Sequence, residues 1–307
     1  PDRLDVPMAR RQTLRNGVEL HTLPDDEFEV LRLSFVFRAG SAVQRVPFSA
    51  SSTANLLSEG SRDMDAQQIA EKLDFYGSYY DVNVDRDYVY LSFCSLSKFF
   101  LPTLEVAERI LLGPVFPEDE VDAYRRKRKQ RLAIERLKVD TKAREALAQA
   151  LFGERHPYGI SYNEAAYDTL TREDLADMYR THYTAGNCLA VCSGNITDAH
   201  LQAIVALAER LPRGGERLRS SFPDPVTQSR RFVHTPDAVQ SSIRLGRLLF
   251  TREHPDFVPM QVVAAALGGY FGSRLMSNLR ERNGYTYGVA AAMVNFCLLY
   301  TSDAADD

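Results

Sequence analysis

The stretch LGGYFGSRLMSNLRERNGYTYGV, residues 267–289, is the part of the chain that says most about its fold. Its pattern predicts a helical segment over 274–282 that ends at Asn283-Gly284, followed by an aromatic strand from Tyr285. Arg280 then lies in the last helical turn, and Tyr287 lies just beyond the turn. We therefore expect the guanidinium group of Arg280 and the phenol of Tyr287 to converge on one spot.

This pair of side chains combines a bidentate cation with a neutral O–H donor. Such a pair suits a peptide carbonyl group whose oxygen gains negative charge during a reaction. A structural alternative is that Arg280 satisfies helix C-terminal carbonyl groups while Tyr287 packs in the core. Chemistry alone leaves both interpretations open.

The bulk composition favours a globular protein of more than one domain. The chain has 307 residues, of which 45% are hydrophobic and 25% are charged, and this length favours two domains. A net charge of −4 argues against nucleic-acid binding. No apolar run reaches the ~20 residues of a membrane span. No signal peptide is visible, and the first residue is not Met, so periplasm and cytoplasm of a bacterium both stay open.

Periodicity predicts strands and helices in an order that repeats coarsely. In the first part, strands are expected at 18–23, 31–39, 79–84, 88–96 and 187–193, and helices at 48–58, 65–77, 99–112, 118–152, 171–182 and 198–211. The 118–152 helix should break near Asp140-Thr141. After a linker over 212–229 that is rich in Pro, Gly, Arg and Ser, strands are expected at 231–234 and 241–249, with a helix at 257–267.

This order predicts an α+β protein of two duplicated domains. Each would be a mostly antiparallel sheet with helices packed on one face, and the second would be truncated. The boundaries are a first domain over 1–211, the linker over 212–229 and a partial second domain over 230–296. The last residues, 297–307, read CLLYTSDAADD. They resemble translated read-through into a sequencing adapter, so we exclude them from fold reasoning and expect the gene to be a fragment. An open second domain should leave an uncovered apolar face.

The segment 267–289 resembles the C-terminal domain of insulinase/pitrilysin-type (inverzincin) zinc peptidases. Those enzymes carry an Arg and a Tyr at this spacing and use them to hold the substrate backbone opposite the zinc. The resemblance covers residues 10–296. It implies two halves that close face to face around a chamber. In split members of the family, one subunit carries the zinc and the other can lack it.

The zinc motif of active members, H-x-x-E-H on a helix, is missing from this chain. Arg38-Ala39-Gly40-Ser41 and the segment 56–61 match its flanks, so the aligned positions are 51–55, with Ser51, Ala54 and Asn55 in place of His, Glu and His. The downstream glutamate aligns with the basic run 125–131, and Glu135 nearby is a lone carboxylate. The histidines form no i, i+4 pair. We therefore expect no metal in this chain.

Two other features have structural interpretations. The basic run 125–131 is typical of a solvated helix face, with a surface for an acidic partner as the alternative. Cys188 and Cys192, four residues apart in a predicted strand, are typical of small core residues. The loop His156-Pro157-Tyr158-Gly159 also resembles one in the family, and we interpret it as structural.

Three functions follow as hypotheses. The first is a non-catalytic subunit of a heterodimeric zinc peptidase, in which a zinc-bearing paralogous partner binds the metal and Arg280 and Tyr287 contact the peptide substrate. The second is a scaffold or binding protein derived from the same family without peptidase activity. The third is an enzyme that works by another route. An adjacent gene with an intact H-x-x-E-H motif would favour the first.

Overall fold

The computed structural model describes residues 7–214 and 230–296. The chain divides into two compact units, residues 1–244 and residues 245–307. Most of the predicted linker over 212–229, and the whole tail over 297–307, lie outside the described residues. Among the described helices, none combines the length and the apolar character that a bilayer crossing requires.

The first unit is built on one six-stranded sheet with the order β1-β2-β6-β3-β5-β4. Neighbouring strands run antiparallel, except for β2 and β6, which run parallel. The short first strand and the β2–β6 pairing are not among the predicted features. The strands are β1 (Arg10–Thr13), β2 (Glu19–Pro24), β3 (Val30–Phe37), β4 (Tyr79–Val84), β5 (Val89–Leu96) and β6 (Cys188–Gly194).

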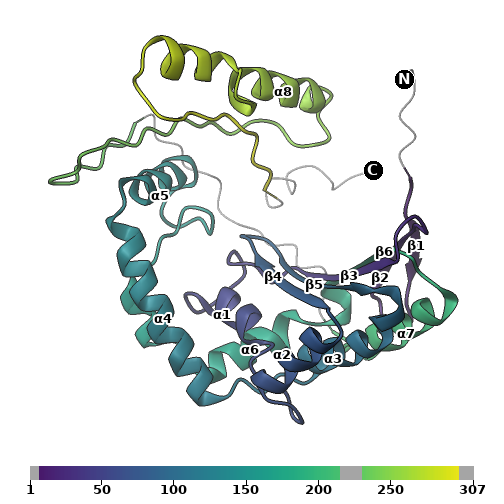
Figure 1. The fold of residues 1–307 in the computed structure, drawn as a ribbon. Helices are drawn as coiled ribbons and strands as arrows, with labels where there is room; N and C mark the ends of the chain where they lie inside the picture. The colour runs from purple at the N-terminus through teal and green to yellow at the C-terminus, as the bar shows by residue number, and fades with distance from the viewer. Residues whose placement is uncertain (1–6, 215–229, 297–307) are drawn as a thin grey trace, which may run out of the picture. The chain divides into compact units, whose positions relative to one another are not determined.

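Alternation of side-chain direction along the strands gives the sheet one buried face. In β3, Leu31, Leu33, Phe35 and Phe37 are fully buried, while the residues between them point to the other face. Helices cover the buried face (Figure 1). They are α1 (Ser49–Leu56), α2 (Ala66–Phe75), α3 (Phe100–Leu112), α6 (Arg172–His182) and α7 (Asp198–Ala208).

Capping residues place the starts of the helices. Asp65 and Thr171 each form a reciprocal capping box with the residue three positions later. The predicted 118–152 helix breaks as expected, but at Lys138 rather than Asp140. Its parts are α4 (Glu118–Leu137) and α5 (Val139–Phe152), and the short 3₁₀ segments are η1 (Ser97–Phe99), η2 (Glu164–Asp168) and η3 (Ala185–Asn187).

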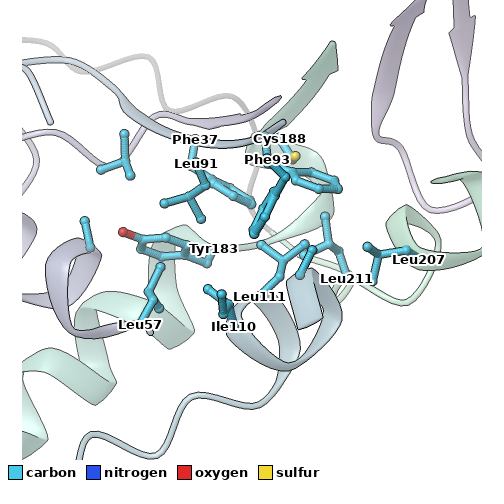
Figure 2. Close-up of a cluster of buried hydrophobic side chains, with 14 of the residues drawn as sticks. Phe37, Leu57, Leu91, Phe93, Ile110, Leu111, Tyr183, Cys188, Leu207 and Leu211 are labelled. Carbon is cyan, nitrogen blue, oxygen red and sulfur yellow. The ribbon is translucent and has the colours of Figure 1, made fainter. Parts of the chain in front are cut away.

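The core lies between this sheet face and the helices (Figure 2). Phe37 of β3 packs against Tyr183 with 4.9 Å between ring centroids. Cys188 and Cys192 are both buried, and burial raises the pKa of the Cys192 thiol to about 12. A thiol with so high a pKa is a poor nucleophile near neutral pH, so the predicted core role of these cysteines is confirmed.

The loop 156–159 joins the turn between β4 and β5 through a buried polar contact. The hydroxyl group of Tyr158 donates to Asp87 at 2.6 Å, and both side chains are buried. Burial and the nearby Arg86 lower the pKa of His156. The loop therefore has a structural contact of the kind expected for it.

The end of β6 depends on a glycine. Gly194 has φ +106°, and a Cβ atom there would lie 2.1 Å from the carbonyl oxygen of Val30. Gly194→Ala should lower the free energy of unfolding by about 2–3 kcal/mol, because backbone strain and a backbone clash add. Urea unfolding measures this loss. The matched control is Gly17→Ala, at φ +98° with no atom within 4 Å, which should cost only ~1 kcal/mol. Equal losses in the two variants would contradict the clash.

The second unit contains helices and no strand within residues 245–296. These are α8 (Phe257–Ala264) and two π-helical segments, η4 (Ala265–Gly269) and η5 (Met276–Arg282). The strands predicted at 231–234, at 241–249 and from Tyr285 are wrong, since these residues are described and form none. The sheet expected for a second domain is therefore absent from the described part. The architecture is α+β as predicted, and the duplication stays a prediction.

The apolar side chains of the second unit are largely uncovered, as the sequence predicts. Helix α8 has no buried residue although its sequence, FVPMQVVA, is strongly apolar. Val258, Val262, Phe271 and Tyr285 are all exposed. Burying a side chain of this size stabilises a protein by roughly 1.5–3 kcal/mol, so this unit gains little stability from its own core.

Candidate functional site

The positions that align with the missing metal motif lie on α1. This helix starts after Phe48, which adopts a left-handed backbone at φ 65°. The ring of Phe48 stacks on Tyr167 of η2 with 4.2 Å between centroids and an interplanar angle of 3°. A bulky residue at positive φ is strained, and this ring stack offsets part of the strain. The stack fixes the start of α1 against η2.

Ser51 and Asn55, one helical turn apart, face the outer side of α1, and Ala54 faces the core. Ala54 is fully buried, Ser51 is half-buried and Asn55 is exposed. Both polar side chains bond to their own helix. The Ser51 hydroxyl donates to the carbonyl oxygen of Phe48 at 3.2 Å, and the Asn55 amide donates to the carbonyl oxygen of Ser51 at 2.7 Å.

These residues do not fit a zinc ion. Zinc in proteins takes imidazole, thiolate or carboxylate ligands, and α1 offers a hydroxyl, a methyl and an amide at the three positions. Within residues 7–214 and 230–296, no group of three or more His, Cys, Asp or Glu side chains lies close enough to hold a metal. His156, His182 and His200 are buried separately in the first unit.

The isolated chain should therefore not retain stoichiometric Zn²⁺ after mild chelation and dialysis. Elemental analysis of the dialysed protein measures the metal content, with an untreated sample as the reference. The contradicting result is one equivalent of zinc that survives dialysis and is lost in Asn55→Ala or Glu135→Gln.

The basic run on α4 has a role that neither sequence interpretation included. Arg125 donates to the carbonyl oxygens of Tyr167 at 2.9 Å and Asp168 at 2.8 Å. Lys129 pairs with the carboxylate of Asp168 at 2.6 Å. Two of the basic side chains thus attach α4 to η2. Glu135, the lone carboxylate nearby, pairs with Arg131 at 2.9 Å, and the hydrogen bond from Arg131 lowers its pKa.

In the second unit, backbone contacts fold the end of η5 back toward the chain that follows it. Gly284 adopts the left-handed conformation at φ 63°, which suits a helix C-terminus. The backbone N–H groups of Gly284 and Tyr285 donate to the carbonyl oxygens of Arg280 and Leu279 at 3.2 and 2.9 Å. Farther on, Ala291 N–H donates to Gly268 at 3.1 Å. The predicted helix end is confirmed.

Arg280 and Tyr287 meet as the spacing predicts, through the face of the ring. The guanidinium carbon of Arg280 lies 5.1 Å from the centroid of the Tyr287 ring, within cation–π distance. Tyr287 is 91% exposed, so it is not a core residue. The role of the pair in substrate binding stays a prediction.

Phe271 is a second aromatic partner of Arg280, and the spacing of residues did not predict it. Its ring centroid lies 4.7 Å from the guanidinium carbon of Arg280, closer than the ring of Tyr287. Phe271 stands nine residues before Arg280, in the turn between η4 and η5. Helical periodicity does not extend through such a turn. The only signal was an aromatic residue next to Gly272 in the quoted stretch.

Three comparisons place the chain among known proteins. A family profile described as "Peptidase M16 inactive domain" matches residues 169–300. A Streptomyces coelicolor protein named "uncharacterized zinc protease" is 23% identical over 269 residues, which are 82% of this chain and 55% of the relative. A Helicobacter pylori protein named "non-peptidase homolog" is 20% identical over 239 residues, 77% of this chain and 55% of the relative.

Among solved structures, the crystal structure of a peptidase M16 inactive domain from Pseudomonas fluorescens superposes with a TM-score of 0.81. It is 22% identical and covers 94% of this chain, which in turn covers 71% of that structure. A sequence identity of 22% supports a similar fold and nothing beyond the fold. The chain spans about half the length of the curated relatives named above.

Proposed function

Because the chain belongs to the insulinase/pitrilysin (M16) peptidase family and carries a site unfit for zinc, we propose that it is the non-catalytic subunit of a peptidase. The zinc would reside in a paralogous partner subunit. This chain would bind the peptide substrate through Arg280 and Tyr287. The substrate would be a peptide chain, whose backbone carbonyl groups offer the acceptors that these two donors need.

The observation that carries this proposal is the meeting of Arg280 and Tyr287 on the surface of the second unit. A guanidinium group whose carbon lies 5.1 Å from the centroid of a phenol ring brings two side chains that carry donors into one place. The guanidinium fork would hold a backbone carbonyl group, and the hydroxyl of Tyr287 would donate to an oxygen that gains charge. None of the three metal-motif residues is present on α1, which supports the proposal that the partner subunit binds the zinc while this chain binds the substrate.

Electrostatics supports the availability of the Arg280 donors. Glu281 is the carboxylate beside Arg280 in sequence, and it accepts a hydrogen bond from the Ser277 hydroxyl at 3.1 Å. Within residues 245–296, Arg280 makes no ion pair. A substrate carbonyl group would therefore not have to displace a carboxylate from Arg280. An ion pair between a guanidinium group and a carboxylate is costly to break when it is well formed.

Assembly with a zinc-bearing partner tests the proposal. We expect the product of a neighbouring gene with an intact H-x-x-E-H motif to co-purify with this chain and to form a stable heterodimer, measured by light scattering after size exclusion. Tyr287→Phe and Arg280→Ala should assemble normally, since both side chains are assigned to substrate. Failure of the two purified chains to associate at micromolar concentration would overturn the subunit proposal.

The second candidate is a scaffold or binding protein without peptidase activity. The uncovered apolar residues of α8 favour it, because exposed apolar patches are typical of protein interaction surfaces. The relative named as a non-peptidase homolog is a further reason to keep it. Under this proposal a partner would bind equally well to the wild type and to Tyr287→Phe, and no peptide turnover would follow assembly.

A further inference from the structure

Arg280 is covered by two aromatic rings, of which only one has a place in the proposed function. Its guanidinium carbon lies over Phe271 at 4.7 Å and over Tyr287 at 5.1 Å. Phe271 carries no polar group, so it has no donor or acceptor to offer a peptide. Any effect of Phe271 on a substrate carbonyl group must therefore come through the side chain that it touches.

The backbone that precedes Arg280 is tied to the helical segment that carries it. Before η5, the N–H group of Ser273 donates to the carbonyl oxygen of Tyr270 at 3.1 Å, and the N–H of Ser277 donates to that of Ser273 at 2.9 Å. Ser273 is fully buried. These bonds place the turn that carries Phe271 at the start of η5, while Arg280 extends from its end.

An arginine side chain loses roughly 1.5–2 kcal/mol of rotamer freedom when it is held in one conformation. A ring stacked on the guanidinium group limits that freedom before any substrate arrives, so less is lost on binding. Stacking occupies a face of the planar group and leaves its N–H donors in the plane, where they can meet a carbonyl oxygen. A ring on Arg280 therefore improves binding without touching the substrate.

We propose that Phe271 is a positioning residue that holds the guanidinium group of Arg280 in the orientation that accepts a substrate backbone carbonyl. The inference rests on the proposed function, because it assigns Arg280 a substrate. It adds Phe271 to the site and gives it a physical role, in which the face of its ring sets the orientation of the Arg280 guanidinium group.

The first test needs this chain alone. In a ¹H–¹⁵N spectrum of the side-chain Nε–Hε groups, stacked rings shift the Arg280 resonance, which Arg280→Lys identifies by its loss. Phe271→Leu keeps an apolar side chain but removes the ring, and it should move this resonance toward the position of a free arginine. Phe271→Tyr should leave the Arg280 resonance at its wild-type position. Tyr285→Leu, an exposed aromatic in the same segment, is the matched control and should leave it in place.

The second test is kinetic and uses the assembled complex with a quenched-fluorescence peptide. Phe271→Leu should raise KM about tenfold with little change in kcat, and Phe271→Tyr should restore the wild-type KM. If Arg280→Ala raises KM and Phe271→Leu does not, the positioning role is wrong while the proposed function stands. If neither variant changes KM, the proposed function fails and the positioning role fails with it. An Arg280 resonance that does not move in Phe271→Leu also overturns the role.

Discussion

Tyr287→Phe should lower kcat of the assembled peptidase by about 10²–10³, which is the effect expected from loss of one donor to a developing oxyanion. The substitution removes one oxygen and keeps the ring that lies 5.1 Å from Arg280, so the aromatic contact persists. Because Tyr287 is 91% exposed, the change should leave folding intact. Single-turnover kinetics on a quenched-fluorescence peptide separate this loss from effects on binding.

Tyr285→Phe is the matched control for this prediction. Tyr285 also loses only a hydroxyl group, lies two residues away and is exposed, so its kcat should equal that of the wild type. Equal kcat values for the wild type, Tyr285→Phe and Tyr287→Phe would remove Tyr287 from the reaction and favour the scaffold interpretation.

Arg280→Ala should lower kcat/KM by about 10², and most of the loss should appear in KM, because the variant lacks the group that holds the substrate backbone. Arg280→Lys should rescue poorly, since an ammonium group keeps the charge and lacks the planar fork of donors. Steady-state kinetics of the two variants in the assembled complex measure both effects.

Arg282→Ala provides the control for charge, because Arg282 is an exposed arginine at the same helix end. It should change kcat/KM less than about threefold. If Arg280→Lys behaves like the wild type, the fork geometry is unimportant and Arg280 acts only as a charge. Wild-type kinetics in Arg280→Ala would reduce the residue to a structural one.

The sequence predicted most of the first unit because its local signals agree. Alternation in residues 31–37 predicts a half-buried strand, and β3 forms there with every second residue buried. Polar residues with a partner three positions later predict helix starts, and the capping box at Thr171 forms. Such features depend on neighbours within a few residues, which a single sequence contains.

Pairing between distant segments could not be predicted in the same way. The parallel contact of β2 with β6 joins Glu19 to Leu189, and no local pattern encodes it. The strands expected at 231–234 and 241–249 failed for the same reason. Alternating apolar residues form a strand only when a neighbouring strand and a buried face are available. Ile243 and Leu245 in the second of these segments are 82% and 93% exposed.

The candidate site also combines features that local spacing predicts with features that depend on contacts between distant segments. The predicted helix end puts Arg280 in the last turn and Tyr287 just beyond it, and helix geometry places Ser51 and Asn55 on one helix face, so both arrangements could be derived from spacing. Phe271 reaches Arg280 through a turn that contains Gly272, where the backbone direction has no periodic rule. The attachment of Arg125 and Lys129 to η2 likewise depends on packing between separate segments.

The most direct test of the central claim is peptide hydrolysis by this chain, by its zinc-bearing partner and by an equimolar mixture of the two. We predict that this chain alone, even with added Zn²⁺, has no activity above buffer, and that the mixture is at least about tenfold more active than the partner alone. A zinc-dependent activity of this chain by itself, or a partner whose full activity is unchanged by adding this chain, would contradict the account.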